Sequence, residues 1–138
     1  GLPHKRANFF KEEPGMSWRE RDEVHRRNLE ILMIAEPSRI DDLAIYIQAR
    51  NIDSARFRSR AFAGGDEIRR MLPHVRLPLK AIWGEKDQIA LPSVEARFEV
   101  LREAHPELDA RIVPDAGHWV AYEQPDVFNA TLLDLLAR

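Results

Sequence analysis

The sequence contains no cysteine. This excludes a disulfide framework, a thiolate metal site and a cysteine nucleophile. It also has no apolar run near the ~20 residues that a membrane-spanning helix needs, since the longest, Ile31 to Ala35, has five. The first fourteen residues lack the apolar stretch of a secretory signal. We therefore predict a cytoplasmic protein that does not enter a membrane.

The chain also has little excess of charge of either sign. Its net charge is −2 over 138 residues, of which 44% are hydrophobic and 32% charged. Residues 1–76 carry 15 Lys and Arg against 12 Asp and Glu, whereas residues 77–138 carry 6 against 11. The composition is that of an ordinary globular domain, and the charge argues against nucleic acid as a partner. The uneven distribution predicts two segments with different surroundings.

The first segment has helical signals and little sign of a strand. Ser17 followed by Glu20 is a capping box, which predicts a helix from there to about Ile34. Apolar residues at helical spacing predict a second helix that begins near Pro37 and ends near Asn51.

Shorter helical pieces are expected between this second helix and the next segment. One is predicted over residues 54–59, before the break at Gly64-Gly65. Asp66 then caps one further turn that ends at Pro73.

The pattern changes at Leu77. A short apolar run predicts a strand over residues 79–83, and LDARIVP predicts a second strand that ends at Pro114. A helix is expected between them over residues 93–104, and a last helix opens at Pro125. Alternation of strand and helix at these spacings is typical of a parallel α/β sheet.

Two loops that follow the predicted strands hold the candidate functional residues. Each has a glycine followed by an ionisable side chain, Asp87 in the first loop and His118 in the second. Ligands collect at this edge of an open α/β sheet, and an aspartate beside a histidine can form the base half of a catalytic triad. Turn chemistry for the aspartate and a solvated role for the histidine are the alternatives.

The residues around these loops resemble the C-terminal part of the α/β-hydrolase superfamily. The resemblance rests on WGEKD for the triad acid, PDAGHW for the triad histidine, and AYEQPDVFNATLLDLL for the final helix. It implies catalytic roles for Asp87 and His118, in the superfamily's order of acid before histidine. It further implies two domains: a lead-in and helical cap over residues 1–76, and the C-terminal part of the α/β core over residues 77–138.

The sequence departs from the superfamily pattern at the nucleophile. No G-x-S-x-G elbow occurs, and an H-G oxyanion segment after an early strand is missing. We therefore expect a Ser or Asp nucleophile outside these 138 residues and an inactive isolated chain. Because two strands leave a sheet edge open, the missing N-terminal half or a second copy of the chain is the expected partner.

The function that the resemblance implies is hydrolysis of an ester or a carbon–carbon bond in a small organic substrate, with epoxide opening and dehalogenation as the alternatives while the nucleophile is unidentified. Trp119, beside the histidine, is predicted to contact the substrate, with packing under the last helix as the alternative. A non-catalytic structural or interaction module is the competing function. No cofactor is expected, and no metal, because the five histidines show no ligand spacing with carboxylates on a common face.

Overall fold

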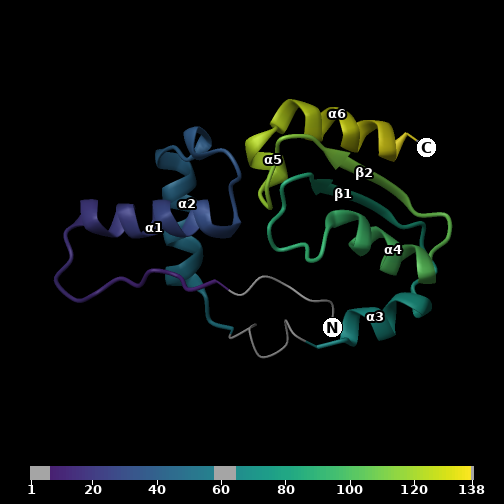
Figure 1. Cartoon of the computed structure of the whole chain (residues 1–138), viewed down its shortest axis with the longest axis horizontal. Helices are drawn as coiled ribbons and strands as arrows, with labels where there is room; N and C mark the ends of the chain where they lie inside the picture. The colour runs from purple at the N-terminus through teal and green to yellow at the C-terminus, as the bar shows by residue number, and fades with distance from the viewer. Residues whose placement is uncertain (1–6, 58–64, 138) are drawn as a thin grey trace.

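The computed structural model describes residues 7–57 and 65–137 of the chain. We call residues 7–57 the helical half and residues 65–137 the sheet half (Figure 1). The helical half contains α1 (Trp18–Leu32), the 3₁₀ turn η1 (Pro37–Arg39) and α2 (Asp42–Ser54). The sheet half contains α3 (Glu67–Met71), the 3₁₀ turn η3 (Leu72–His74), β1 (Lys80–Gly84), α4 (Val94–Ala104), β2 (Asp109–Val113), α5 (Val120–Glu123) and α6 (Pro125–Leu136).

The start of α1 confirms the predicted capping box. The Ser17 hydroxyl accepts from the Glu20 N–H at 3.4 Å, and the Glu20 carboxylate accepts from the Ser17 N–H at 2.7 Å. These reciprocal bonds satisfy two N–H groups that the first helical turn would otherwise leave unpaired. The helix ends at Leu32, two residues before the expected end.

The second helix begins later than predicted. Pro37 opens only the short turn η1, and α2 starts after Asp41, whose carboxylate accepts from the Ala44 N–H at 2.9 Å. Aspartate in an extended conformation is a strong N-cap, so it sets the start in place of the proline. The helix continues past Asn51 to Ser54. Residues 55–57 are not helical, and the rest of the predicted piece over 54–59 lies outside the described residues.

The two strands form the parallel pair that the sequence predicts. Within the described residues the sheet has two strands, with Trp83 opposite Ile112 and Gly84 opposite Val113. Helices α4 and α6 lie on opposite sides of it (Figure 1). The fold is thus a mixed helical structure with a small parallel sheet, consistent with part of an α/β fold.

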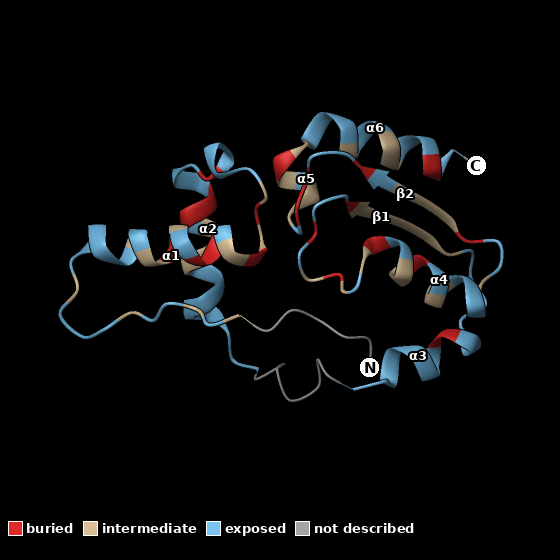
Figure 2. Ribbon diagram, in the orientation of Figure 1, coloured by how far each residue is buried: buried red, intermediate tan, exposed pale blue. Residues whose placement is uncertain are grey.

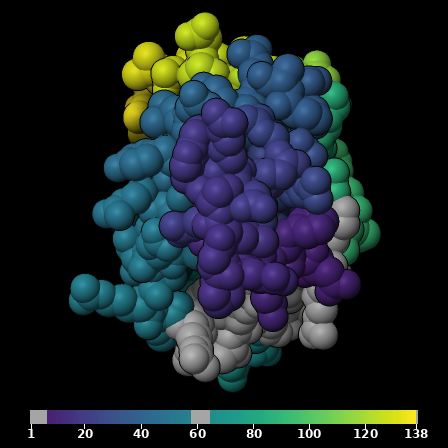
Figure 3. Space-filling view, turned by 90° about the vertical axis from the view of Figure 1, so that its left-hand side faces the viewer, coloured from purple at the N-terminus to yellow at the C-terminus, as the bar shows by residue number. Residues whose placement is uncertain are grey.

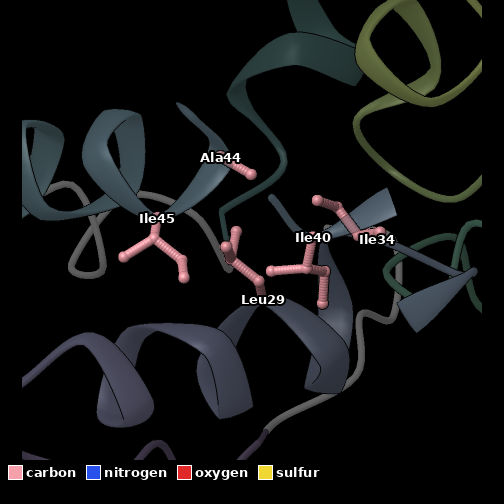
Figure 4. Close-up of a cluster of buried hydrophobic side chains, with 5 residues drawn as sticks. All are labelled: Leu29, Ile34, Ile40, Ala44 and Ile45. Atoms are coloured by element: carbon pink, nitrogen blue, oxygen red, sulfur yellow. The ribbon is translucent and has the colours of Figure 1, made fainter. Parts of the chain in front are cut away.

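Buried residues occur in both halves (Figure 2), and each half has its own cluster of buried apolar side chains. In the helical half the cluster lies between α1, η1 and α2, and in the sheet half it lies between α4 and one face of the strands. The first consists of Leu29, Ile34, Ile40, Ala44 and Ile45 (Figure 4), and the second of Ala90, Val94, Phe98 and Leu108. Full burial of one such large apolar side chain stabilises a fold by about 1.5–3 kcal/mol.

The helical half covers one end of the molecule. Seen from that end, α1 and α2 form a continuous face, with α6 visible at its upper edge (Figure 3). The contact with the sheet half involves the partly buried Trp119 and Tyr122, which pack against the helical cluster. The segment after β2, which carries the predicted histidine, therefore lies at the junction of the two halves.

Candidate active site

A glycine at the end of β1 brings the two candidate loops together. A Cβ atom at Gly84 would lie 2.2 Å from the carbonyl oxygen of Gly117 and 2.4 Å from that of Ala116. Any side chain at this position would collide with backbone, so only glycine permits the approach. The Lys86 N–H donates to the Ala116 carbonyl at 2.8 Å and fastens the loops to each other.

The two predicted site residues lie within hydrogen-bonding distance. Oδ2 of Asp87 is 3.0 Å from Nδ1 of His118, and Oδ1 accepts from the Ile89 N–H at 2.8 Å. Asp87 is 7% exposed. The Ile89 bond is the turn chemistry expected as the alternative role of Asp87, so the carboxylate both supports its own turn and contacts the imidazole.

The environment of Asp87 favours its ionised form. Burial is the largest single influence and would raise the pKa, because it removes the carboxylate from water. The hydrogen bonds from His118 and the Ile89 N–H act in the opposite direction, and the net result is a pKa below the ordinary value. An ionised Asp87 accepts the proton on Nδ1 of His118, which fixes the neutral imidazole as the tautomer with Nε2 as acceptor.

The loop that carries the histidine turns sharply after β2. Asp115 has a φ of 56°, in the left-handed region that aspartate tolerates better than most residues. The side chain of His118 is 41% exposed, in contrast to its nearly buried partner Asp87. This is the arrangement that a reacting imidazole needs: one nitrogen is held and the rest of the ring remains accessible.

A cavity of about 370 Å³ lies against the pair and includes both Asp87 and His118 in its lining. Most of the lining is apolar and comes from Ile68, Leu72, Trp83, Ala90, Val100 and Leu101. Arg97 also lines it and donates to the Ile89 carbonyl at 3.1 Å, which supports the loop that carries Asp87. The space suits a small, largely apolar molecule.

Trp119 packs on the helical half. Its ring makes an edge-on contact with Tyr122, with centroids 5.8 Å apart, and lies against the cluster that contains Leu29. Trp119 is not among the residues that line the cavity beside Asp87 and His118. Contact with a substrate stays a prediction for this residue.

None of the serines that the structure describes lines the cavity. Ser17 and Ser93 cap α1 and α4, Ser38 bonds to the Glu36 carboxylate, and Ser54 ends α2. Ser59 lies outside the described residues. The structure thus brings together an acid and an imidazole, without a serine beside them in the part of the chain that it describes.

Glu123 has no role predicted from the sequence, and it lies 1% exposed beside the histidine loop. Its carboxylate accepts from backbone N–H groups of both halves. The available signal was its place two residues before Pro125, at the start of the last helix, in the segment used only to recognise that helix.

Residues 7–57 and 65–137 contain no group of three or more His, Asp or Glu side chains placed to hold a metal ion. In the same residues, no helix combines the length and the apolar character that crossing a bilayer requires. A cytoplasmic location stays a prediction.

Comparison with known proteins gives one curated relative. The chain is 28% identical, over 79 residues, to a 2-hydroxy-6-oxononadienedioate/2-hydroxy-6-oxononatrienedioate hydrolase from a Pseudomonas species. The match includes 57% of this chain and 27% of that enzyme, so the chain spans about a quarter of the relative's length. No protein-family model matches the sequence.

Two solved structures have a similar fold. A membrane phospholipase A, described as a bacterial virulence factor, superimposes with a TM-score of 0.60 and 19% identity over 84% of this chain and 38% of its own. Cfl2 from Burkholderia cenocepacia gives a TM-score of 0.54 and 19% identity over 91% and 50%. At this identity the likeness concerns the fold alone. The chain thus resembles a hydrolase in part of its sequence and a phospholipase in its fold.

Proposed function

We propose that the chain is the acid- and histidine-bearing part of an α/β-type hydrolase that cleaves an ester or a carbon–carbon bond in a small organic substrate. The observation that carries the proposal is the 3.0 Å contact between Asp87 Oδ2 and His118 Nδ1 at the ends of two adjacent parallel strands. A buried carboxylate, an accessible imidazole and an apolar cavity meet at that point.

In this proposal His118 acts as general base and then as general acid. Nε2 accepts the proton of a serine hydroxyl as the oxygen attacks the substrate carbonyl, and it later donates that proton to the leaving group. Where the nucleophile is an aspartate, the same nitrogen takes a proton from the water that hydrolyses the covalent intermediate. Asp87 stays ionised throughout and stabilises the imidazolium that forms.

We place the nucleophile on further strands of the same sheet, with the helical half as a cap over the site. Two features support this arrangement. Within the described residues β1 pairs only with β2, which leaves backbone groups along its other edge for an additional strand. In addition, Leu133 and Leu136 of α6 are 68% and 69% exposed, which is unusual for large apolar side chains in a helix next to a sheet.

The test is hydrolysis of a nitrophenyl ester by the chain alone and by the chain mixed with a fragment that carries a strand, a G-x-S-x-G elbow and a helix. Turnover is expected only in the mixture, and it should disappear in His118→Ala. His74→Ala is the matched control, because His74 is exposed on η3 and does not line the cavity.

Other outcomes would replace the proposal. Turnover by the chain alone that is lost in His118→Ala would indicate an independent enzyme. Absence of turnover in every mixture would favour the non-catalytic module. Light scattering tests the open sheet edge: a dimer would identify a second copy as its partner, and a stable monomer with two-state unfolding would contradict any need for one.

A further inference from the structure

The carboxylate of Glu123 joins the two halves of the molecule. Oε1 accepts from the N–H groups of Ala35 at 2.8 Å and Glu36 at 3.0 Å, in the segment between α1 and η1. Oε2 accepts from the N–H of Gly117 at 2.6 Å, in the loop after β2. A single side chain thus bridges two backbone segments that are more than 80 residues apart in sequence.

One further hydrogen bond and one close backbone approach join the same two segments. The Trp119 N–H donates to the Met33 carbonyl at 2.8 Å. A Cβ atom at Gly117 would lie 2.8 Å from the Ala35 nitrogen, 2.9 Å from Oε2 of Glu123 and 3.1 Å from the Met33 carbonyl oxygen. The loop is therefore held from the helical half both by hydrogen bonds and by backbone contact that leaves no room for a side chain.

His118 is the residue between these two contacts along the chain. Its chain neighbour on one side bonds to Glu123, and its neighbour on the other side bonds to the helical half. The imidazole itself is exposed and has the Asp87 carboxylate as its hydrogen-bond partner. Its position relative to Asp87 therefore depends on where the backbone of residues 117–119 is held.

Replacing the Glu123 carboxylate would leave a buried backbone N–H group at this junction without an acceptor. A buried carboxylate is tolerable here because several backbone N–H groups solvate it. Glutamine has nearly the same shape, but its amide nitrogen would face N–H donors where an oxygen now accepts. At least one buried N–H would lose its acceptor, and the segments would separate to restore contact with water.

We propose that Glu123 is a positioning residue for His118, and that it makes the alignment of the imidazole with Asp87 depend on the contact between the two halves. The proposal rests on the proposed function for its catalytic meaning, whereas its structural content can be measured without a substrate. Displacement of the helical half would then be transmitted to the imidazole through residues 33–36.

The experiment is NMR spectroscopy of the isotopically labelled 138-residue chain, with two signals as readout. One is the Nδ1–H proton of His118 in its bond to Asp87, and the other is the titration of the Asp87 carboxyl carbon. In Glu123→Gln the Nδ1–H signal should broaden or disappear. The Asp87 titration should move to higher pH, because burial persists while the histidine bond is weakened.

Two further variants make the result specific. Glu85→Gln is the matched control. Glu85 is exposed in the loop after β1 and accepts from the Asp115 N–H, in the loop that carries His118, at 3.1 Å. Because water can replace an exposed acceptor, both signals should stay as in the wild type. Gly117→Ala should reproduce the effect of Glu123→Gln without changing any charge, because its Cβ pushes the segments apart. It also provides the test if Glu123→Gln does not fold.

The proposal is overturned if a folded Glu123→Gln or Gly117→Ala chain keeps both signals unchanged while the amide resonances of residues 35 and 36 shift. Glu123 would then hold the segments without influence on the imidazole. Failure of the nitrophenyl ester assay is a separate outcome, since it would remove the catalytic meaning of the Asp87–His118 pair and leave these NMR results as they are.

Discussion

The helical half and the sheet half differ in how their chemistry is distributed. In the sheet half, the backbone of the two loops approaches closely at Gly84, and a buried carboxylate lies beside an accessible imidazole. In the helical half, the interior is an apolar cluster, and the carboxylate of Asp41 is exposed as a helix cap. The helical half also contains an imidazole–carboxylate pair, Glu12 and His25 at 2.9 Å, but there the imidazole is buried, at 2% exposed. Of these two pairs, only the one in the sheet half combines a buried carboxylate with an accessible imidazole.

The largest predicted effect is the loss of catalytic turnover when the carboxylate of the reactive pair in the sheet half is replaced. In the mixture with a nucleophile-bearing fragment, Asp87→Asn should lower turnover by about 10⁴-fold, because asparagine favours the wrong tautomer of His118. Glu103→Gln, which removes an exposed carboxylate of α4 paired with Arg69, is the control and should leave turnover unchanged. Equal rates for Asp87→Asn and the wild type would remove Asp87 from the proposed triad.

The next largest predicted effect is on the free energy of unfolding when a side chain is removed from either apolar cluster. Leu29→Ala in the helical half should cost about 2–5 kcal/mol of unfolding free energy and Phe98→Ala in the sheet half about 3–5 kcal/mol, since both side chains are nearly fully buried. Urea unfolding is followed by fluorescence of tryptophan in single-tryptophan chains that retain either Trp83, which contacts Phe98, or Trp119, which contacts the helical cluster.

The two fluorescence probes decide whether the halves are one cooperative unit. If they unfold together, each substitution lowers the midpoint seen by both tryptophans. Leu133→Ala, on the exposed face of α6, is the control and should change the free energy of unfolding by less than about 0.5 kcal/mol. A Leu29→Ala chain in which only the Trp119 signal moves would show that the halves unfold independently.

The stability of the sheet half should also depend on pH in the acid range. The folded-state pKa of Asp87 lies below its ordinary value, so its contribution to stability is present above about pH 4 and is lost as the pH falls through the folded pKa. Asp87→Asn should therefore flatten the fall in urea midpoint between about pH 5 and pH 3. Glu107→Gln, which removes an exposed carboxyl, is the control; an unchanged slope in Asp87→Asn would contradict the pKa direction.

Sequence reasoning located the pair because its signals are local. The glycines before Asp87 and His118 and the strands that precede them are readable from short windows, and parallel pairing brings neighbouring strand ends together. Glu123 was missed because its meaning depends on residues 35 and 36, whose approach to the loop no short window contains. The start of α2 was misplaced because two competing start signals, Pro37 and Asp41, lie four residues apart.

The smallest predicted effect comes from a single side-chain hydrogen bond between the sheet half and the helical half. Tyr122 of α5 donates its hydroxyl to the Asp41 carboxylate of the helical half. Burial and this carboxylate raise the pKa of Tyr122 to about 12. Because the folded pKa exceeds the unfolded value, the contribution of this hydrogen bond to stability is complete below about pH 10 and is lost as the pH rises through 12.

Absorbance at alkaline pH should show a component near 12 that Tyr122→Phe removes and Tyr46→Phe retains. If Tyr122→Phe leaves the alkaline titration unchanged, the phenol does not make this bond, and Glu123 and the backbone contacts of residues 117 and 119 hold the junction without it.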